Sequence, residues 1–94
     1  MKLEIRSAAR CDLAEISAYI ARDNPLRASS FARDLSDKIR MVADRPLSFP
    51  ARDEWQTGAR SAVHGKYHIV FRVEEKRVIV LRILHAARNL PDIV

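Results

Sequence analysis

The stretch RSAVHGKYHIVFRVEEKRVIVLRIL, residues 60–84, decides the fold of this chain. It contains three runs rich in β-branched and aromatic residues, which are typical of β-strands. The runs are residues 60–64, 67–73 and 77–84. Gly65-Lys66 can close the first pair as a two-residue turn with glycine at its first central position, and residues 74–76 can close the second pair. The stretch therefore predicts an antiparallel meander.

Two amphipathic helices are predicted ahead of this meander. The first covers about residues 8–22, with Ser7 as its N-cap, and Asn24-Pro25 then supplies the cap and the first residue of the second. The second helix ends before Pro46, because the residue before a proline avoids helical geometry. Both carry an apolar stripe with spacings of three and four. The stripes are Leu13, Ile16 and Ile20, then Ala28, Phe31, Leu35, Ile39 and Val42, while Arg10, Asp12, Glu15 and Arg22 are expected to face water.

A short strand and a loop complete the organisation. Residues 2–6 alternate charged and apolar side chains, which predicts a half-buried strand. Residues 46–58 are rich in proline and polar groups and predict a surface loop that Phe49 or Trp55 anchors to the core. We therefore expect one α+β domain over residues 1–94, ordered β-α-α-β-β-β, with a helix hairpin packed on one face of a small antiparallel sheet.

The length and the net charge limit the classes of protein to which this chain can belong. The chain has 94 residues, enough for one modest core, and a formal net charge of +5. This charge favours an acidic partner, which could be nucleic acid, a membrane surface or an acidic protein segment. Cys11 is the single cysteine, so no intramolecular disulfide is expected, and the charged residues near the start do not fit a signal peptide. No apolar run approaches the roughly 18 residues of a membrane span, so we expect a cytoplasmic protein.

The two longest strands are predicted to carry a second apolar face. Strict alternation assigns Tyr67, Ile69, Phe71, Val73, Ile79, Leu81 and Ile83 to the face that meets the helices. It assigns His68, Val70, Arg72, Val78, Val80, Arg82 and Leu84 to the opposite face, which is too apolar to meet water. The cover is either the chain's own C-terminal tail or a homodimer, or else a docked partner segment. Arg72 and Arg82 would rim this face with positive charge suited to carboxylates or phosphates.

Candidate catalytic groups are few. The chain has only two glycines, and His64 and His68 lack further ligands at metal-binding spacing, so neither a cofactor nor a metal is indicated. His85 ends the last strand between Arg82 and Arg88, where it could act as a general acid or base beside arginines that stabilise a phosphate. The simpler interpretation is a hydrogen bond between His85 and the backbone at the end of the strand.

An ordered set of short motifs runs along almost the whole chain. The set comprises N-P at residues 24–25, D-E-W at 53–55, G-A-R-S at 58–61, G-K-Y-H-I-V-F-R-V at 65–73 and V-L-R-I-L-H-A-A-R-N-L at 80–90. With Asp12-Leu13 and Tyr19-Ile20-Ala21 in the first helix, this combination resembles the ParE toxins of the RelE/ParE superfamily.

The resemblance implies a cytoplasmic toxin that poisons DNA gyrase through protein contacts and is neutralised by a ParD-like antitoxin with an acidic C-terminal segment. Toxins of the ParE type have no established enzymatic residues, so no catalytic residue is expected. The candidate antitoxin-binding residues are Val70, Arg72, Val78, Val80 and Arg82 on the second face. The candidate target-binding residues are Leu84, His85, Arg88, Asn89 and Leu90 in the C-terminal part.

The other branch of the superfamily, represented by RelE, cleaves mRNA in the ribosome and provides the alternative function. Arg60, Arg82 and His85 stand where such members carry catalytic groups. A strict two-residue turn would place Arg60 opposite Phe71 on the helix-facing side, a register that the sequence leaves open. Residues 86–94 contain no aromatic side chain to stack on a base, which disfavours the nuclease. Direct DNA binding is also disfavoured, because the basic residues are spread over every predicted element.

Overall fold

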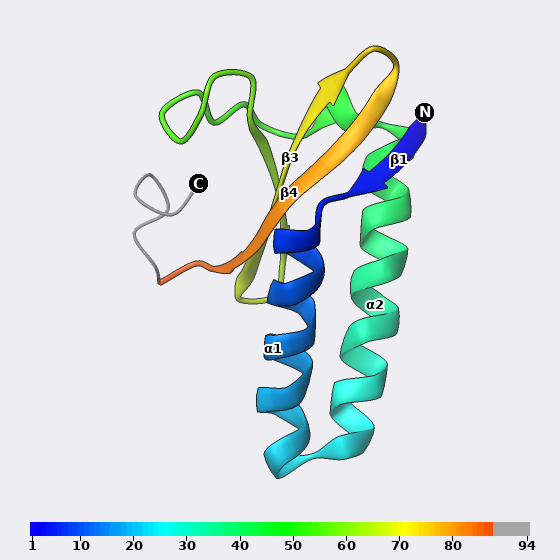
Figure 1. Cartoon of the computed structure of the whole chain (residues 1–94), viewed down its shortest axis with the longest axis vertical. Coiled ribbons are helices and arrows are strands. Elements are labelled where there is room, and N and C mark those ends of the chain that lie inside the picture. Colours follow the sequence, from blue (N-terminus) through cyan, green and yellow to red (C-terminus); the bar gives the residue numbers. More distant parts are fainter. Residues whose placement is uncertain (88–94) are drawn as a thin grey trace.

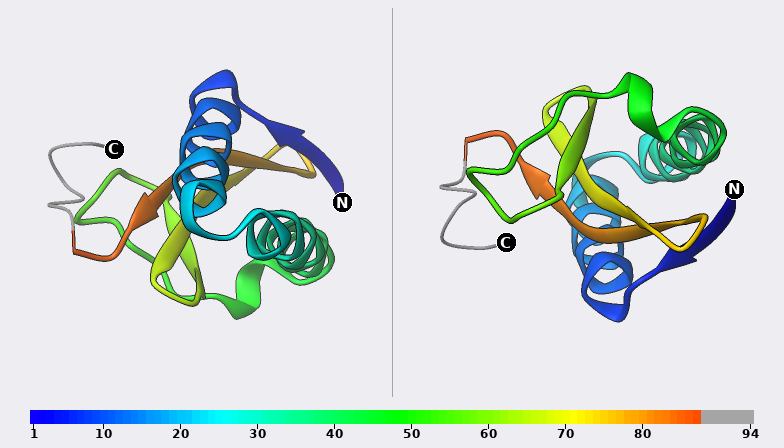
Figure 2. Two further views of the ribbon diagram at one scale, coloured as in Figure 1. Left: turned by 90° about the horizontal axis from the view of Figure 1, so that it is seen from below. Right: turned by 90° about the horizontal axis from the view of Figure 1, so that it is seen from above.

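A helix hairpin lies across one face of a four-stranded sheet in the computed structural model, which describes residues 1–87 (Figure 1). The elements are β1 (Lys2–Ile5), α1 (Ser7–Asp23), α2 (Pro25–Asp44), the short 3₁₀ helix η1 (Pro46–Ser48), β2 (Arg60–His64), β3 (Tyr67–Glu74) and β4 (Arg77–His85). This order confirms the predicted β-α-α-β-β-β organisation. The end-on views show α1 and α2 side by side on the same side of the strands (Figure 2). No helix within residues 1–87 is long and apolar enough to cross a membrane.

The sheet has the strand order β1-β4-β3-β2. β3 pairs antiparallel with both β2 and β4, so the predicted meander is confirmed. β1 adds to the outer edge of β4 in the parallel direction, which makes the sheet mixed rather than wholly antiparallel. Parallel strands need a long connection between them. Here the chain leaves β1, runs along α1 and returns along α2 before it enters the meander that contains β4.

Local turn chemistry sets the register of the meander. His64 pairs with Tyr67, so Gly65 and Lys66 form a two-residue turn, and the φ of Gly65 is 59°, as its position requires. The same register places Arg60 opposite Phe71, which settles the position that the sequence left open. In the second hairpin Glu75 and Lys76 form the turn with φ of 49° and 63°, a left-handed conformation that neither residue favours.

The two helices begin differently from each other. Asn24 caps α2, since its Oδ1 accepts a hydrogen bond from the backbone N–H of Arg27 at 3.0 Å, as predicted. The prediction that Ser7 caps α1 is wrong, because Arg6 occupies the N-cap and Ser7 is the first helical residue. The reason is that the N–H of Arg6 still donates to Val80 O at 3.0 Å, so the extended backbone of β1 runs directly into the helix.

A β-bulge in β4 exchanges the faces of half of that strand. Val70 pairs with Arg82 but Phe71 pairs with Val80, so Leu81 is an extra residue in β4. Because of this shift, Val78 and Val80 point into the helix-facing core and are fully buried. The prediction that placed them on the second face is therefore wrong, as is the prediction that placed Ile79 and Leu81 under the helices.

The apolar residues form two clusters, one on each face of the sheet. Under the helices lie Ala9, Phe31, Leu35, Ile39, Val42, Ala62, Ile69, Phe71, Val78, Val80 and Ile83. On the second face lie Ala59, Val70, Ile79, Leu81 and Leu84, with Trp55 packed against them. The apolar stripes of both helices are confirmed, and so are the faces predicted for Ile69, Phe71 and Ile83.

The loop between η1 and β2 covers part of the second face. Trp55 packs on the second cluster, while Phe49 packs edge-on against Phe71 in the main core, with ring centroids 6.0 Å apart. Both of the residues predicted as possible anchors, Phe49 and Trp55, therefore hold the loop against the rest of the domain. Backbone hydrogen bonds from Arg52 N to Ala59 O, at 2.7 Å, and from Ser61 N to Pro50 O, at 3.2 Å, hold the loop beside β2. Part of the cover that the sequence assigned to a tail, a homodimer or a partner is thus the chain's own loop.

Candidate functional site

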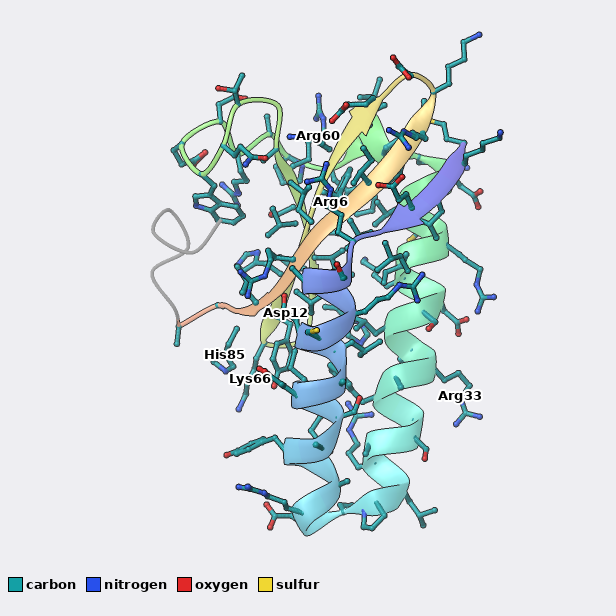
Figure 3. All side chains as sticks on the ribbon, viewed as in Figure 1. Arg6, Asp12, Arg33, Arg60, Lys66 and His85 are labelled. Carbon is teal, nitrogen blue, oxygen red and sulfur yellow. The ribbon has the colours of Figure 1, made fainter. Side chains whose placement is uncertain are left out.

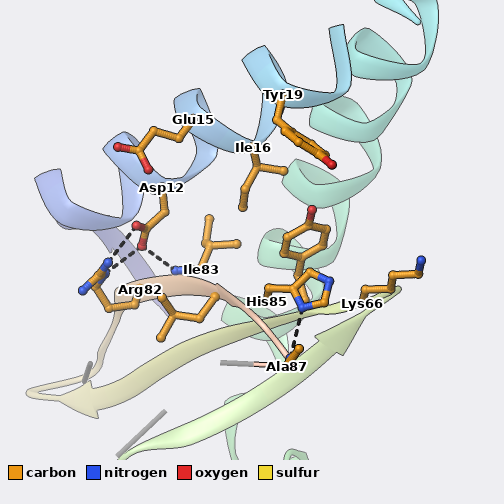
Figure 4. Close-up of a pocket in the computed structure, with 11 residues that line it drawn as sticks. Asp12, Glu15, Ile16, Tyr19, Lys66, Arg82, Ile83, His85 and Ala87 are labelled. Carbon is orange, nitrogen blue, oxygen red and sulfur yellow. Dashed lines mark hydrogen bonds and ion pairs between the residues drawn. The ribbon is translucent and has the colours of Figure 1, made fainter. Parts of the chain in front are cut away.

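A groove of about 660 Å³ lies between α1 and the end of β4 (Figure 4). Four residues of α1 line it, at spacings that place them on one side of the helix. The remainder come from the β2–β3 turn, the start of β3, the end of β4 and the residues just after it. The lining residues are Asp12, Glu15, Ile16, Tyr19, Lys66, Tyr67, Arg82, Ile83, Leu84, His85 and Ala87. The groove therefore combines aromatic, acidic and basic side chains.

Asp12 joins α1 to the edge of β4. Its Oδ2 accepts hydrogen bonds from Arg82 Nε at 2.7 Å and from the backbone N–H of Ile83 at 2.9 Å, and its Oδ1 accepts one from Arg82 Nη2 at 2.9 Å. Beyond Val80, no strand among residues 1–87 lies on the outer edge of β4, because β1 ends at Ile5. The carboxylate of Asp12 thus replaces the acceptor that a neighbouring strand would supply.

The prediction that Asp12 faces water is wrong, because the residue is only 9% exposed. The hydrogen bond from Arg82 to Asp12 is the main reason that the pKa of Arg82 is raised above its ordinary value. A single acidic residue near a helix start gives no pattern from which this contact could be predicted. The burial of the Asp12–Arg82 ion pair depends on β1 ending before the bulge in β4, which only the structure reveals.

The two arginines that were predicted to form one basic rim are separated. Arg82 turns toward α1, since the bulge re-aims its side chain. Arg72 stays on the second face, where it forms an ion pair with Glu74 and donates a hydrogen bond to Gln56 Oε1 at 3.3 Å. Of the five candidate antitoxin-binding residues, Val70, Val78 and Val80 are fully buried, so none of the three offers side-chain surface in this conformation.

His85 is engaged with the backbone at the end of β4. Its Nδ1 accepts a hydrogen bond from the N–H of Ala87 at 3.0 Å, and its ring lies edge-on to Tyr67 with centroids 5.3 Å apart. The simpler of the two interpretations, a backbone hydrogen bond, is confirmed. Because Nδ1 is the acceptor, the neutral imidazole carries its proton on Nε2. The ring of Tyr19, which is 66% exposed, faces His85 from α1 across the groove (Figure 4).

Arg60 lies away from this groove. Its Nη1 donates to Phe49 O at 2.7 Å, and it stands toward the opposite end of the sheet from His85 and Lys66 (Figure 3). Of the three candidate nuclease residues, Arg82 and His85 line this groove and Arg60 does not, and each of the three is bound to a different neighbour.

The remaining candidate residues divide between the second face and the tail. Leu84 is 3% exposed and packs in the second cluster. Arg88, Asn89 and Leu90 lie outside the residues that the structure describes. His64 lies beside Phe31 and His68 beside Trp55, and within residues 1–87 no three His, Cys, Asp or Glu side chains come close enough to hold a metal ion.

Comparison with solved structures identifies the class of fold. A chain of the chromosomal ParDE toxin-antitoxin system from P. aeruginosa superimposes with a TM-score of 0.80 at 22% identity, over 90% of this chain and 95% of that chain. A chain of the RelBE2 toxin-antitoxin complex from Mycobacterium tuberculosis superimposes with a TM-score of 0.64 at 22% identity, over 89% of this chain and 95% of that chain. The chain therefore shares its fold with these two solved chains.

Sequence comparison then identifies the branch. Residues 3–90 match the family of ParE toxins of type II toxin-antitoxin systems, parDE. Toxin ParE1 of Caulobacter vibrioides is 32% identical over 82 residues, which cover 86% of this chain and 84% of the relative. The chain belongs to the ParE toxin family.

Proposed function

We propose that the chain inhibits DNA gyrase through protein contacts and that a ParD-like antitoxin neutralises it. Membership of the ParE family supports this proposal, as does the similarity to a chain of a ParDE system. The surface of this chain that contacts gyrase is the groove beside His85, together with the residues that follow β4.

The separation of the candidate nuclease groups is the observation that carries the proposal. Cleavage of RNA at a 2'-hydroxyl needs a base, a phosphate-stabilising cation and an acid around one phosphate. Here Asp12 binds the guanidinium of Arg82 through two of its nitrogens, Arg60 is bound to Phe49 O, and His85 accepts from Ala87. A function that depends on surface contact needs no such convergence.

The groove has the composition of a protein contact site. Tyr19 exposes 66% of its surface, and large aromatic side chains with a polar tip are enriched where proteins bind one another. Glu15 on α1 and Lys66 in the turn add charges of opposite sign at its rim. This mixture suits a partner surface with its own mixed charges better than a uniformly anionic nucleic acid.

A supercoiling assay tests the proposal. The purified chain should stop gyrase from supercoiling relaxed plasmid or should trap cleaved DNA, and addition of the antitoxin should restore supercoiling. Normal supercoiling at saturating toxin would reject gyrase as the target.

Ribosome-dependent RNA cleavage is the second candidate, because His85, Lys66 and Tyr19 still line one groove. In a translating extract the nuclease would cut mRNA only on ribosomes, and His85→Ala would slow the cutting by about 10²- to 10⁴-fold. Intact transcripts in that extract would exclude it.

A further inference from the structure

The outer edge of β1 is open. β1 is a terminal strand of the sheet, and no strand within residues 1–87 pairs with its outer side. The N–H of Arg6 points inward to Val80 O, and backbone groups alternate along a strand, so the N–H and C=O groups of Leu3 and Ile5 point outward. An edge of this kind is a template for another strand.

An apolar groove of about 260 Å³ runs beside this edge, between β1 and α2. Leu3, Ile5, Ser36, Ile39 and Arg40 line it. Ile39 is buried, whereas Leu3 is still 38% exposed, so the groove is open on the side where a further strand would lie. Every second side chain of an added strand would point into this groove, because side chains alternate between the two faces of a sheet.

The charges around the edge favour an acidic occupant. Within residues 1–87, Lys2, Arg6 and Arg10 form no ion pair, and Arg10 Nε lies at the outer edge itself, where it donates to Ile5 O at 3.3 Å. The neighbouring carboxylates are already bound, Glu4 to Arg77 at 2.6 Å and Asp37 to Arg40 at 2.8 Å. A second copy of the chain would bring the same three cations against each other, which disfavours a homodimer at this edge.

We infer that the β1 edge receives an extended acidic segment of the antitoxin as a fifth strand of the sheet. Main-chain hydrogen bonds to Leu3 and to the N–H of Ile5 hold the segment, since Ile5 O already accepts from Arg10 Nε. One or more of its apolar side chains enter the groove beside Ile39, and its carboxylates meet the unpaired cations. The inference rests on the proposed function for its partner, and it locates that partner on a surface separate from the groove at His85.

A matched pair of variants tests the strand addition. Leu3→Pro removes an N–H that points outward, so the ladder to β4 is kept, whereas Leu3→Ala removes only the side chain. Binding of a purified ParD-like antitoxin is measured by titration calorimetry. We expect Leu3→Ala to weaken binding roughly tenfold, and Leu3→Pro on the order of 100-fold, since the proline also blocks the approach of a strand.

A charge reversal at each end of α1 tests the acidic character of the segment. Arg6→Glu places a carboxylate at the N-cap of α1, where the helix dipole favours it, and should weaken antitoxin binding roughly tenfold at low salt. Arg22→Glu makes the same change in net charge in the last turn of α1 and should alter binding by less than about twofold.

Amide hydrogen exchange provides a readout that needs no variant. In the wild-type complex the amides of Leu3 and Ile5 should become protected, while the amide of Glu4, which points toward β4, is protected with and without the antitoxin. Unchanged exchange at Leu3 and Ile5, or equal affinities of wild type and Leu3→Pro, would overturn the inference and leave antitoxin binding intact. A toxin dimer that Leu3→Pro dissociates would assign the edge to a second copy instead. If the wild type bound no antitoxin, the proposed neutralisation would fail together with this inference.

Discussion

Asp12 of α1 holds Arg82 of β4 through both carboxylate oxygens, at 2.7 and 2.9 Å, and also accepts the backbone N–H of Ile83. This contact fastens the first helix to the end of β4, where β3 lies on one edge and, among residues 1–87, no strand lies on the other. It also holds the guanidinium of Arg82 against α1, at one side of the groove.

Replacing Asp12 should therefore destabilise the fold. Asp12→Ala removes the acceptor of two hydrogen bonds from Arg82 and of one from the buried N–H of Ile83, so we expect a loss of about 2–4 kcal/mol in the free energy of unfolding. Asp37→Ala is the matched control, because the Asp37–Arg40 pair is exposed and should contribute less than about 0.5 kcal/mol. Urea denaturation of both variants measures the difference, and equal losses would contradict the role given to Asp12.

Stability should fall at mildly acidic pH because of His68. Burial, and then the positive charge of Arg52, lower the pKa of His68 below its ordinary value of 6.5. The unfolded chain therefore binds a proton more readily than the folded one, and the contribution to stability is lost as the pH falls from 6.5 toward the folded pKa. His68→Phe should flatten this part of the profile in urea denaturation between pH 5 and about 8. An unchanged profile would mean that another group titrates there.

Trp55 should protect the second face of the sheet. It packs against the cluster formed by Ala59, Val70, Ile79, Leu81 and Leu84. Trp55→Ala should cost about 2–3 kcal/mol, less than for a fully buried tryptophan, and should increase the binding of an apolar dye because it uncovers this cluster. A variant with wild-type stability and dye binding would show that the loop does not provide the cover.

Local chemistry made much of the fold predictable from the sequence. The two-residue turn at Gly65-Lys66, the Asn24 cap and the apolar stripes depend on residues close together in the chain, and all were confirmed. The faces of β4 were mispredicted because strict alternation cannot reveal that Leu81 is an extra residue.

The site was less predictable than the fold. Asp12 is buried because it accepts the N–H of Ile83, which has no partner on β1. That N–H lacks a partner because of where β1 ends relative to β4, which is a property of the whole sheet. The separation of Arg60 from His85 likewise depends on the register of the whole sheet. His85 was identified from its place at the end of the last strand, and the backbone hydrogen bond predicted for it there is present.

Tyr19 should matter more for gyrase inhibition than His85. A half-exposed aromatic side chain at a contact surface commonly contributes about 1–2 kcal/mol or more to binding, so Tyr19→Ala should raise the inhibitory concentration by at least about tenfold. His85→Ala removes a ring that is bound to the chain's own backbone and should change it by less than about tenfold. Thermal denaturation of both variants checks that they remain folded.

The central claim is that the chain acts by protein contact and not by catalysis. The most direct test compares the effects of Tyr19→Ala and His85→Ala in one gyrase supercoiling titration. The account predicts that wild type and His85→Ala inhibit gyrase at similar concentrations, that Tyr19→Ala requires at least about tenfold more, and that mRNA in a translating extract stays intact with all three. Gyrase that is unaffected by the wild type, together with mRNA cleavage that His85→Ala slows by about 10²-fold or more, would contradict it.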